Sequence, residues 1–186
     1  MSDVVNINRL SRPVKNMDLG GKIASLITVV NGLHESLLNH TLTAPGIVIG
    51  SSDPAKVKIA ATTTFVVGGV FKSKTTAEVA FTATSHDIAA HASLVKEAVY
   101  TLSLKADLSA VLTMGTIAVG SGKALAPAAP AGQAVCGQVR IAVAAGATPF
   151  DASTDSLASG HLTVAYTDLL LRPADIASLI ATLTTA

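Results

Sequence analysis

The hydrophobic period of this 186-residue chain changes from seven residues to two, and this change limits the fold more than any other feature. Before residue 40 the apolar positions form two interleaved series with a spacing of seven, the a/d pattern of a helix that packs along a narrow seam. From Val57 onward apolar and polar residues alternate, which is the period of a half-buried strand. The sequence therefore predicts a mainly β protein with an N-terminal helix.

The heptad segment predicts an amphipathic helix over residues 18–43 that mediates assembly. It begins at Asp18, a residue type that caps helix N-termini, and it ends before Ala44-Pro45-Gly46. The narrow seam favours self-association, and an amphipathic helix packed on its own domain is the alternative. Ile and Val at the a positions, with Leu at the d positions, favour a two-stranded coiled coil. The predicted self-association residues are Leu19, Ile23, Leu26, Val30, Leu33 and Leu37.

The two ends of the chain have patterns of their own. Residues 1–17 contain asparagines and a proline that interrupt any helical pattern, so we expect an extended arm that becomes ordered against a neighbour, or else a frayed terminus. Residues 172–186 begin with Arg-Pro and continue with an apolar stripe at helical spacing, which predicts a short C-terminal helix. The apolar arm residues expected to anchor the protein are Val4, Val5, Ile7 and Leu10.

Residues 44–171 are predicted to form a β-domain. Valine and threonine suit half-buried pleated strands, and stretches rich in Gly and Pro separate the alternating runs. Many short strands at this spacing predict an antiparallel β-sandwich or a barrel-like domain, and the sequence does not choose between them. The alternating apolar series are Val57-Ile59-Ala61, Ala77-Val79-Phe81-Ala83, Tyr100-Leu102-Leu104, Val135-Gly137-Val139-Ile141-Val143 and Leu162-Val164-Tyr166.

The composition restricts the partners of the protein. Charged residues make up 13% of the chain and the formal net charge is +1, so no basic stripe is present for a phosphate backbone. Aromatic residues are only 3% and tryptophan is absent, which argues against stacking platforms for sugars or single-stranded nucleic acid. No uninterrupted run of ~18 apolar residues occurs. We therefore expect neither a nucleic-acid partner nor a membrane partner. We also expect that much of the apolar surface is buried between subunits.

Two segments begin like ligand-binding loops but do not complete the patterns. Gly120-Ser121-Gly122-Lys123 lacks the preceding glycine of a phosphate-binding loop and has Ala124 where Ser or Thr is needed, so we expect a glycine-rich β-turn. Asp151-Ala-Ser153-Thr-Asp155 begins like a calcium loop but has Ser156 at the glycine position and Leu162 at the glutamate position. An Asx- or Ser-type turn is expected there instead.

Candidate metal ligands and nucleophiles find little support. His86 and His91 are five residues apart, so on a helix or a strand they point in different directions, and we expect a solvated loop around Asp87. Cys136 lies in an alternating strand, where a small buried or interfacial thiol is expected. His40 occupies the next d position after the seam, where a polar side chain is expected to mark the register or the end of the helix rather than to bind a ligand. If several copies of the helix meet, the charge of His40 would make assembly sensitive to pH between 5 and 8. The sequence predicts no catalytic residue, no metal site and no cofactor, and a protein that is not an enzyme.

Several stretches between residues 60 and 170 share a resemblance to one family. Thr82-Ala-Thr-Ser-His-Asp-Ile-Ala-Ala-His91 leads into the strand at Tyr100, and Leu125-Ala-Pro-Ala-Ala-Pro-Ala-Gly-Gln-Ala-Val135 leads into the next long strand. Pro149-Phe-Asp-Ala-Ser-Thr-Asp155 and Leu162-Thr-Val-Ala-Tyr166 follow. This order resembles β-domains in virion proteins of tailed bacteriophages, which include capsid decoration (cement) proteins, head fibres and related appendages.

The resemblance implies a homotrimeric structural protein of the virion, assembled in the host cytoplasm and seated on a lattice of the major capsid protein. In that role the arm would anchor the subunit and the helix would assemble it. A head or tail fibre module that binds a host surface is the alternative, and an enzyme with carboxylates contributed across subunits ranks last. The resemblance carries no catalytic residue over to this chain.

Overall fold

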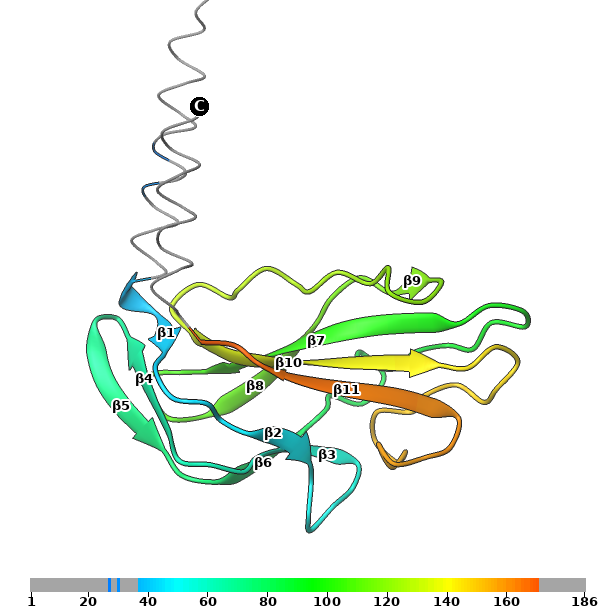
Figure 1. Ribbon diagram of the computed structural model, residues 1–186, viewed down its shortest axis with the longest axis horizontal. Helices are drawn as coiled ribbons and strands as arrows, with labels where there is room; N and C mark the ends of the chain where they lie inside the picture. The colour runs from blue at the N-terminus through cyan, green and yellow to red at the C-terminus, as the bar shows by residue number, and fades with distance from the viewer. Residues whose placement is uncertain (1–26, 28–29, 31–36, 171–186) are drawn as a thin grey trace, which may run out of the picture.

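Strands dominate the part of the protein that the computed structural model describes, which comprises Ile27, Val30 and residues 37–170. Within these residues eleven strands form three sheets, and the strand pairs are antiparallel (Figure 1). The predicted mainly β architecture with antiparallel sheets is therefore confirmed. The predicted arm over 1–17, most of the helix predicted over 18–43 and the helix predicted over 172–186 lie outside the described residues.

The largest sheet has five strands and contains the longest strands of the domain. Its order is β11-β10-β7-β8, and the short β9 pairs with the first residues of β7, beyond the end of β8. Alternating apolar residues give β7 one face toward the core. The strands of this sheet are β7 (Lys96–Leu104), β8 (Ala110–Met114), β9 (Ala118–Val119), β10 (Ala134–Val143) and β11 (Leu162–Asp168).

Two three-stranded sheets complete the domain; in the view of Figure 1 the sheet that contains β4 lies at the left of the large sheet, and the sheet that contains β3 lies below it. In one of them β4 lies between β1 and β5, and in the other β3 lies between β2 and β6. The strands of the first are β1 (His40–Thr41), β4 (Thr63–Val67) and β5 (Val70–Lys74), and those of the second are β2 (Ile47–Ile49), β3 (Lys56–Ile59) and β6 (Ala77–Ala80).

One hydrophobic core joins all three sheets. Ile59 from β3, Phe65 from β4 and Tyr100 from β7 are completely buried in it. The ring of Phe81 meets the rings of Tyr100 and Phe150 edge to face, with centroids 5.0 and 5.7 Å apart, a favoured geometry for aromatic pairs. A chain with only four Phe and two Tyr thus places three of these six rings in one cluster.

A β-bulge in β10 interrupts the alternation that the sequence predicts there. The ladder to β7 shifts register between Val135 and Gly137, so the extra residue reverses the side-chain direction at this point. Cys136 is buried in the core, whereas Val135 is half-buried and turns away from it. The prediction of one uninterrupted series from 135 to 143 is therefore wrong, and Gly137 was the sequence signal for a bulge.

Strand structure starts earlier than the sequence predicts. His40 and Thr41 form β1 and pair with Val66 and Phe65 of β4, although the predicted helix extends to residue 43. Thr41 is 1% exposed, and its Oγ1 donates a hydrogen bond of 2.9 Å to the carbonyl of Val135. His40 is consequently a strand residue rather than the next d position of a heptad, because pairing with distant strands decides its conformation.

The outward face of β7 is covered by the chain itself. The segment 120–133 passes over this face (Figure 1). There the Ala124 amide donates to the Glu97 carboxylate (2.7 Å), and Ser103 is hydrogen-bonded to Gln133 (2.6 Å). This strand is therefore buried on both sides. Its outward residues, each at most 2% exposed, are Glu97, Val99, Thr101 and Ser103.

Candidate functional site

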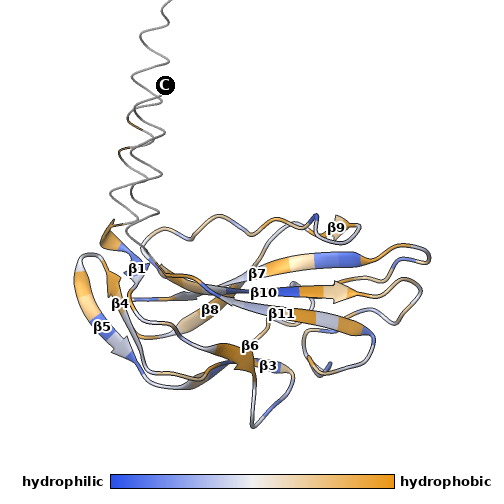
Figure 2. Cartoon of the chain, viewed as in Figure 1, coloured by the Kyte–Doolittle hydropathy of each residue, from blue (hydrophilic) through white to orange (hydrophobic). Residues whose placement is uncertain are grey.

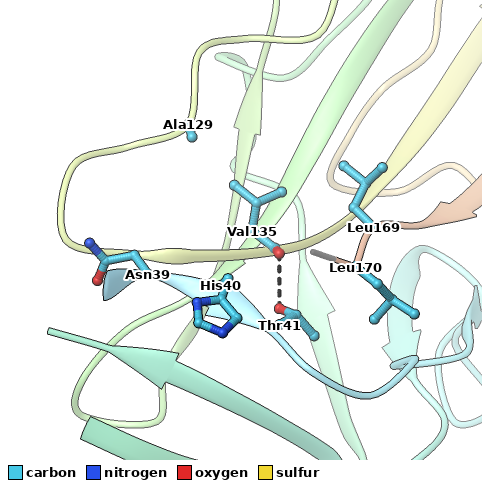
Figure 3. A pocket seen from close by; sticks show the side chains of 7 residues that line it. All are labelled: Asn39, His40, Thr41, Ala129, Val135, Leu169 and Leu170. Carbon is cyan, nitrogen blue, oxygen red and sulfur yellow. Dashed lines mark hydrogen bonds between the residues drawn. The ribbon is translucent and has the colours of Figure 1, made fainter. Parts of the chain in front are cut away.

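The chain enters and leaves the described domain at the same end. Residues from both points line one open, mostly apolar pocket of about 210 Å³ (Figure 3). The pocket lies between β1, the bulged end of β10 and the residues that follow β11. Its lining residues are Asn39, His40, Thr41, Ala129, Val135, Leu169 and Leu170.

Two hydrogen bonds hold the walls of this pocket together. One is the bond from the Thr41 hydroxyl to the Val135 carbonyl, drawn in Figure 3, and the other joins the Leu169 amide to the Cys136 carbonyl at 3.0 Å. The bulge turns Val135 toward the pocket. Among the described lining residues His40 is the one titratable side chain. The lining therefore suits apolar packing better than proton transfer or nucleophilic attack.

The hairpin between β4 and β5 is attached directly to the segment where the chain enters. Its turn, Gly68-Gly69, has φ angles of 59° and 75°, which glycine adopts without strain and which two-residue hairpin turns require. The Gly69 amide donates to the Leu38 carbonyl (3.1 Å), and the Gly68 amide donates to Asn39 Oδ1 (2.9 Å). The hairpin therefore has a fixed position beside the entering chain.

Exposed apolar side chains lie at the entering chain and the hairpin. Phe71 is 72% exposed and Val70 is 56% exposed, directly after the glycine turn. Figure 2 shows β5 as apolar at this end and polar along the rest of the strand. The sequence analysis missed Phe71; the available signal was an aromatic residue two positions after the Gly68-Gly69 turn. Of the predicted seam residues, Val30 and Leu37 are described and are 51% and 45% exposed.

The remaining predicted interaction residues are not brought into this picture. The seam residues Leu19, Ile23, Leu26 and Leu33 and the arm residues Val4, Val5, Ile7 and Leu10 lie outside the described residues, so their roles remain predictions.

The glycine-rich segment at 120–123 contains a turn, as expected. Backbone amides at this turn are hydrogen-bonded to the carboxylate of a buried side chain. Glu97 accepts hydrogen bonds from the Ala124 and Gly122 amides and forms an ion pair of 2.9 Å with Arg140. Burial raises the pKa of Glu97, but these hydrogen bonds and the arginine together bring the pKa below its usual value. The buried carboxylate occupies the donors that a phosphate would need.

The segment Asp151–Asp155 is a hydrogen-bonded turn, which confirms the prediction. Asp151 Oδ1 accepts from the amide and the hydroxyl of Ser153 (2.8 and 2.6 Å), and the Asp151 amide donates to Asp155. The structure also brings Asp87 to this turn, where it accepts from the Ala152 amide at 2.8 Å. These carboxylates are tied to the loop backbone and do not form a paired acid and base.

His86 is buried, so the prediction of a solvated loop is wrong for this residue. It is 7% exposed; its Nδ1 accepts from the Thr82 amide (3.0 Å) and its carbonyl accepts from the Tyr100 hydroxyl (2.6 Å). Burial lowers the pKa of His86, and the nearby Asp87 raises it less. Tertiary packing against Phe81 and Tyr100 places the ring inside, which the spacing of His86 and His91 could not indicate.

Two further candidate residues have structural surroundings. His91 Nδ1 accepts from the Ser93 and Leu94 amides, which shapes the loop before β7. Cys136 is buried, and burial with the nearby Asp168 raises the pKa of its thiol to about 12, so the group is protonated at neutral pH. In the described part of the chain no three His, Cys, Asp or Glu side chains are grouped as metal ligands.

Comparisons with known proteins return no relative: no protein-family model, no curated protein and no solved structure matches this chain. Within the described residues, no helix has both the length and the apolar character needed to cross a membrane. The functional argument therefore rests on the residues and their geometry.

Proposed function

We propose that this protein is a non-enzymatic structural subunit of a bacteriophage virion, a capsid decoration (cement) protein that stabilises the head through contacts between subunits. In this proposal the subunit is a homotrimer that contacts the major capsid protein, with an antiparallel β-sandwich as its folded domain. The observation that carries the proposal is one group of exposed apolar residues: Leu37, Val70 and Phe71 lie at the end where the chain enters.

The polar groups of the described domain support a structural role. Glu97, Asp151 and His86 each receive hydrogen bonds from backbone amides, so they hold loops in place. Catalytic acids and bases need free lone pairs or protons directed at a substrate. The apolar entry end instead resembles the fully buried centre of a protein interface, which is depleted of charge.

A head or tail fibre module is the second candidate, and one observation favours it. Leu169 and Leu170 line the same pocket as Asn39 and His40, so both connections to the described domain leave from one end. The loops around residues 91–94 and 144–160 are then free at the other end to meet a host surface.

Solution mass and particle binding test the proposal. We expect light scattering to give a homo-oligomer, with three copies in the trimer proposal. Deletion of residues 1–17 should abolish binding to capsids while the circular dichroism of the β-domain is unchanged. Unimpaired binding of the deletion variant would contradict the anchoring role of Val4, Val5, Ile7 and Leu10. Binding of the isolated domain to host cells, without binding to capsids, would favour the fibre module.

A further inference from the structure

The outward face of the β1–β4–β5 sheet is uncharged. Residues that face each other across antiparallel strands point to the same side of the sheet, so the pairing defines which side chains share this face. Val66 pairs with His40 on one side and Phe71 on the other, and Thr64 pairs with Ser73. The described residues of this face include no Lys, Arg, Asp or Glu. We call it the Phe71 face; Val66 at its centre is buried (4% exposed), and its other residues are His40, Leu42, Thr64, Phe71 and Ser73.

The charged residues of β5 lie on the opposite side. Lys72 pairs with the core residue Phe65, and Lys74 pairs with Thr63, so both lysines project away from the Phe71 face. The sheet order ends at β5, which makes it an edge strand. Lysines on an edge strand oppose the addition of another strand. A partner is therefore expected to pack on the Phe71 face rather than to pair with the backbone of β5.

The amount of exposed apolar surface on this face requires an explanation. Phe71 is 72% exposed and Leu42 is 41% exposed, while Leu37, at the adjoining entry point, is 45% exposed. Single exposed apolar residues are ordinary on soluble proteins, but grouped ones mark interaction sites. The turn that begins β5 is hydrogen-bonded to Leu38 and Asn39, so the start of β5 lies beside the entering chain, directly after Leu37 in the sequence.

We infer that the Phe71 face is an interface for a second copy of this chain. The inference rests on the proposed self-association through the seam that ends at Leu37, and it extends that interface from the seam onto the β-domain. When two copies of this chain meet through the same face, charged residues on that face would bring like charges together, and an uncharged face avoids this repulsion. A partner that is recognised by its charge would not require an uncharged face. The turn of the β4–β5 hairpin is hydrogen-bonded to the residues that follow Leu37, so the proposed interface would continue from the end of the seam onto this face.

A single tryptophan reports whether this face is covered. The chain contains no tryptophan, so a F71W variant of the full-length protein carries one fluorescent indole on the Phe71 face. The matched control is L125W, because Leu125 is 77% exposed and belongs to the segment that covers β7. Both variants are titrated over concentration, with emission wavelength and light-scattering mass recorded on the same samples.

We expect the F71W emission to move to shorter wavelength as the oligomer forms, while the L125W emission stays at the wavelength of a solvated indole. A F71S variant should weaken association roughly tenfold or more, because a buried phenylalanine side chain is worth at least that factor. An oligomer in which F71W emits like L125W would overturn this inference and leave the seam proposal intact. A chain that is monomeric at all concentrations would overturn the seam proposal and this inference together.

Discussion

Two outward sheet faces of this domain have similar alternating strand patterns but differ in whether other parts of the chain cover them. On β7 the outward residues include Glu97 and Ser103, yet the segment 120–133 covers them and satisfies them with hydrogen bonds. On the β1–β4–β5 sheet the outward Phe71 is apolar and remains 72% exposed. The polar face is buried by the chain itself, whereas on the apolar face Phe71 is exposed and only Val66 beside it is buried.

The difference shows that alternation along a strand does not say which outward face meets solvent. A polar residue on the outward face can be buried when it has hydrogen-bond or ion-pair partners. Glu97 has such partners in Arg140 and the Ala124 amide. Among the residues that the structure describes, nothing gives such an explanation for the exposed aromatic ring of Phe71. The comparison therefore separates residues that stabilise the fold from residues available for assembly, and the following substitutions test that separation.

The largest expected effect comes from the two phenylalanines of the β1–β4–β5 sheet. Phe65 is completely buried and Phe71 is not, although the two strands that carry them are neighbours. Phe65→Ala should lower the free energy of unfolding by roughly 3–5 kcal/mol, since it leaves a cavity in the core. Phe71→Ala should change it by less than about 0.5 kcal/mol. Urea titration of dilute protein measures both; similar losses for the two variants would refute the assignment of faces.

The next effect concerns the covered face of β7. Glu97→Ala leaves Arg140 and two loop amides without their anion, so we expect a loss of about 3 kcal/mol, the low end for a buried pair because the Arg140 side chain is 38% exposed. Glu78→Ala is the control, since Glu78 also accepts two amides, of Ser51 and Ser52, but at the surface. Urea titration should give a clearly smaller loss of unfolding free energy for the control. Equal losses would contradict a stabilising role for the buried Glu97 carboxylate and its partners.

A pH effect is expected from His86. Burial lowers the pKa of His86 in the folded protein, so below about pH 6.5, the ordinary histidine pKa, the unfolded chain binds a proton that the folded chain does not. The free energy of unfolding should therefore fall as pH decreases from 7 to 5. The Asn side-chain oxygen of the His86→Asn variant can accept the hydrogen bond from the Thr82 amide. In this variant the unfolding free energy should fall less steeply with decreasing pH. Identical pH profiles by thermal or urea unfolding would show that His86 does not contribute.

The smallest effect is expected at Thr101, beneath the same covering segment. Its Oγ1 is buried and has no hydrogen-bond partner among the described residues. Thr101→Val removes a desolvated hydroxyl at nearly constant shape, so stability should stay unchanged or rise by about 1 kcal/mol. Ser103→Ala is a useful contrast, because Ser103 is hydrogen-bonded to Gln133 and its loss should destabilise. A marked destabilisation by Thr101→Val would mean that the hydroxyl has a partner.

The strands were the most predictable part of the fold. The series at Val57-Ile59 and Tyr100-Leu102-Leu104 lie in the core as the period of two requires, because alternation is a local property of extended backbone. The series across residues 135–143 was interrupted by a bulge, whose position depends on pairing with β7. His40 was assigned to a helix and lies in β1, because its pairing partner Val66 is far along the chain.

The candidate site was less predictable than the fold. The turns at 120–123 and 151–155 followed from Gly, Asp and Ser at short spacing, which act through local hydrogen bonds. The sequence did not indicate that His86 is buried or that Phe71 is exposed. Both outcomes depend on which segments pack over a given strand.

By itself the sequence determined the strand periodicity, the turn positions and the absence of complete ligand-binding motifs, since each of these is encoded within a few neighbouring residues. Only the tertiary structure decided the pairing of Glu97 with Arg140, the direction of Val135 and the contrast between the covered face of β7 and the exposed side chain of Phe71. These features join residues that are distant in the chain. Their energies come from burial and hydrogen bonding that exist only after the sheets have assembled.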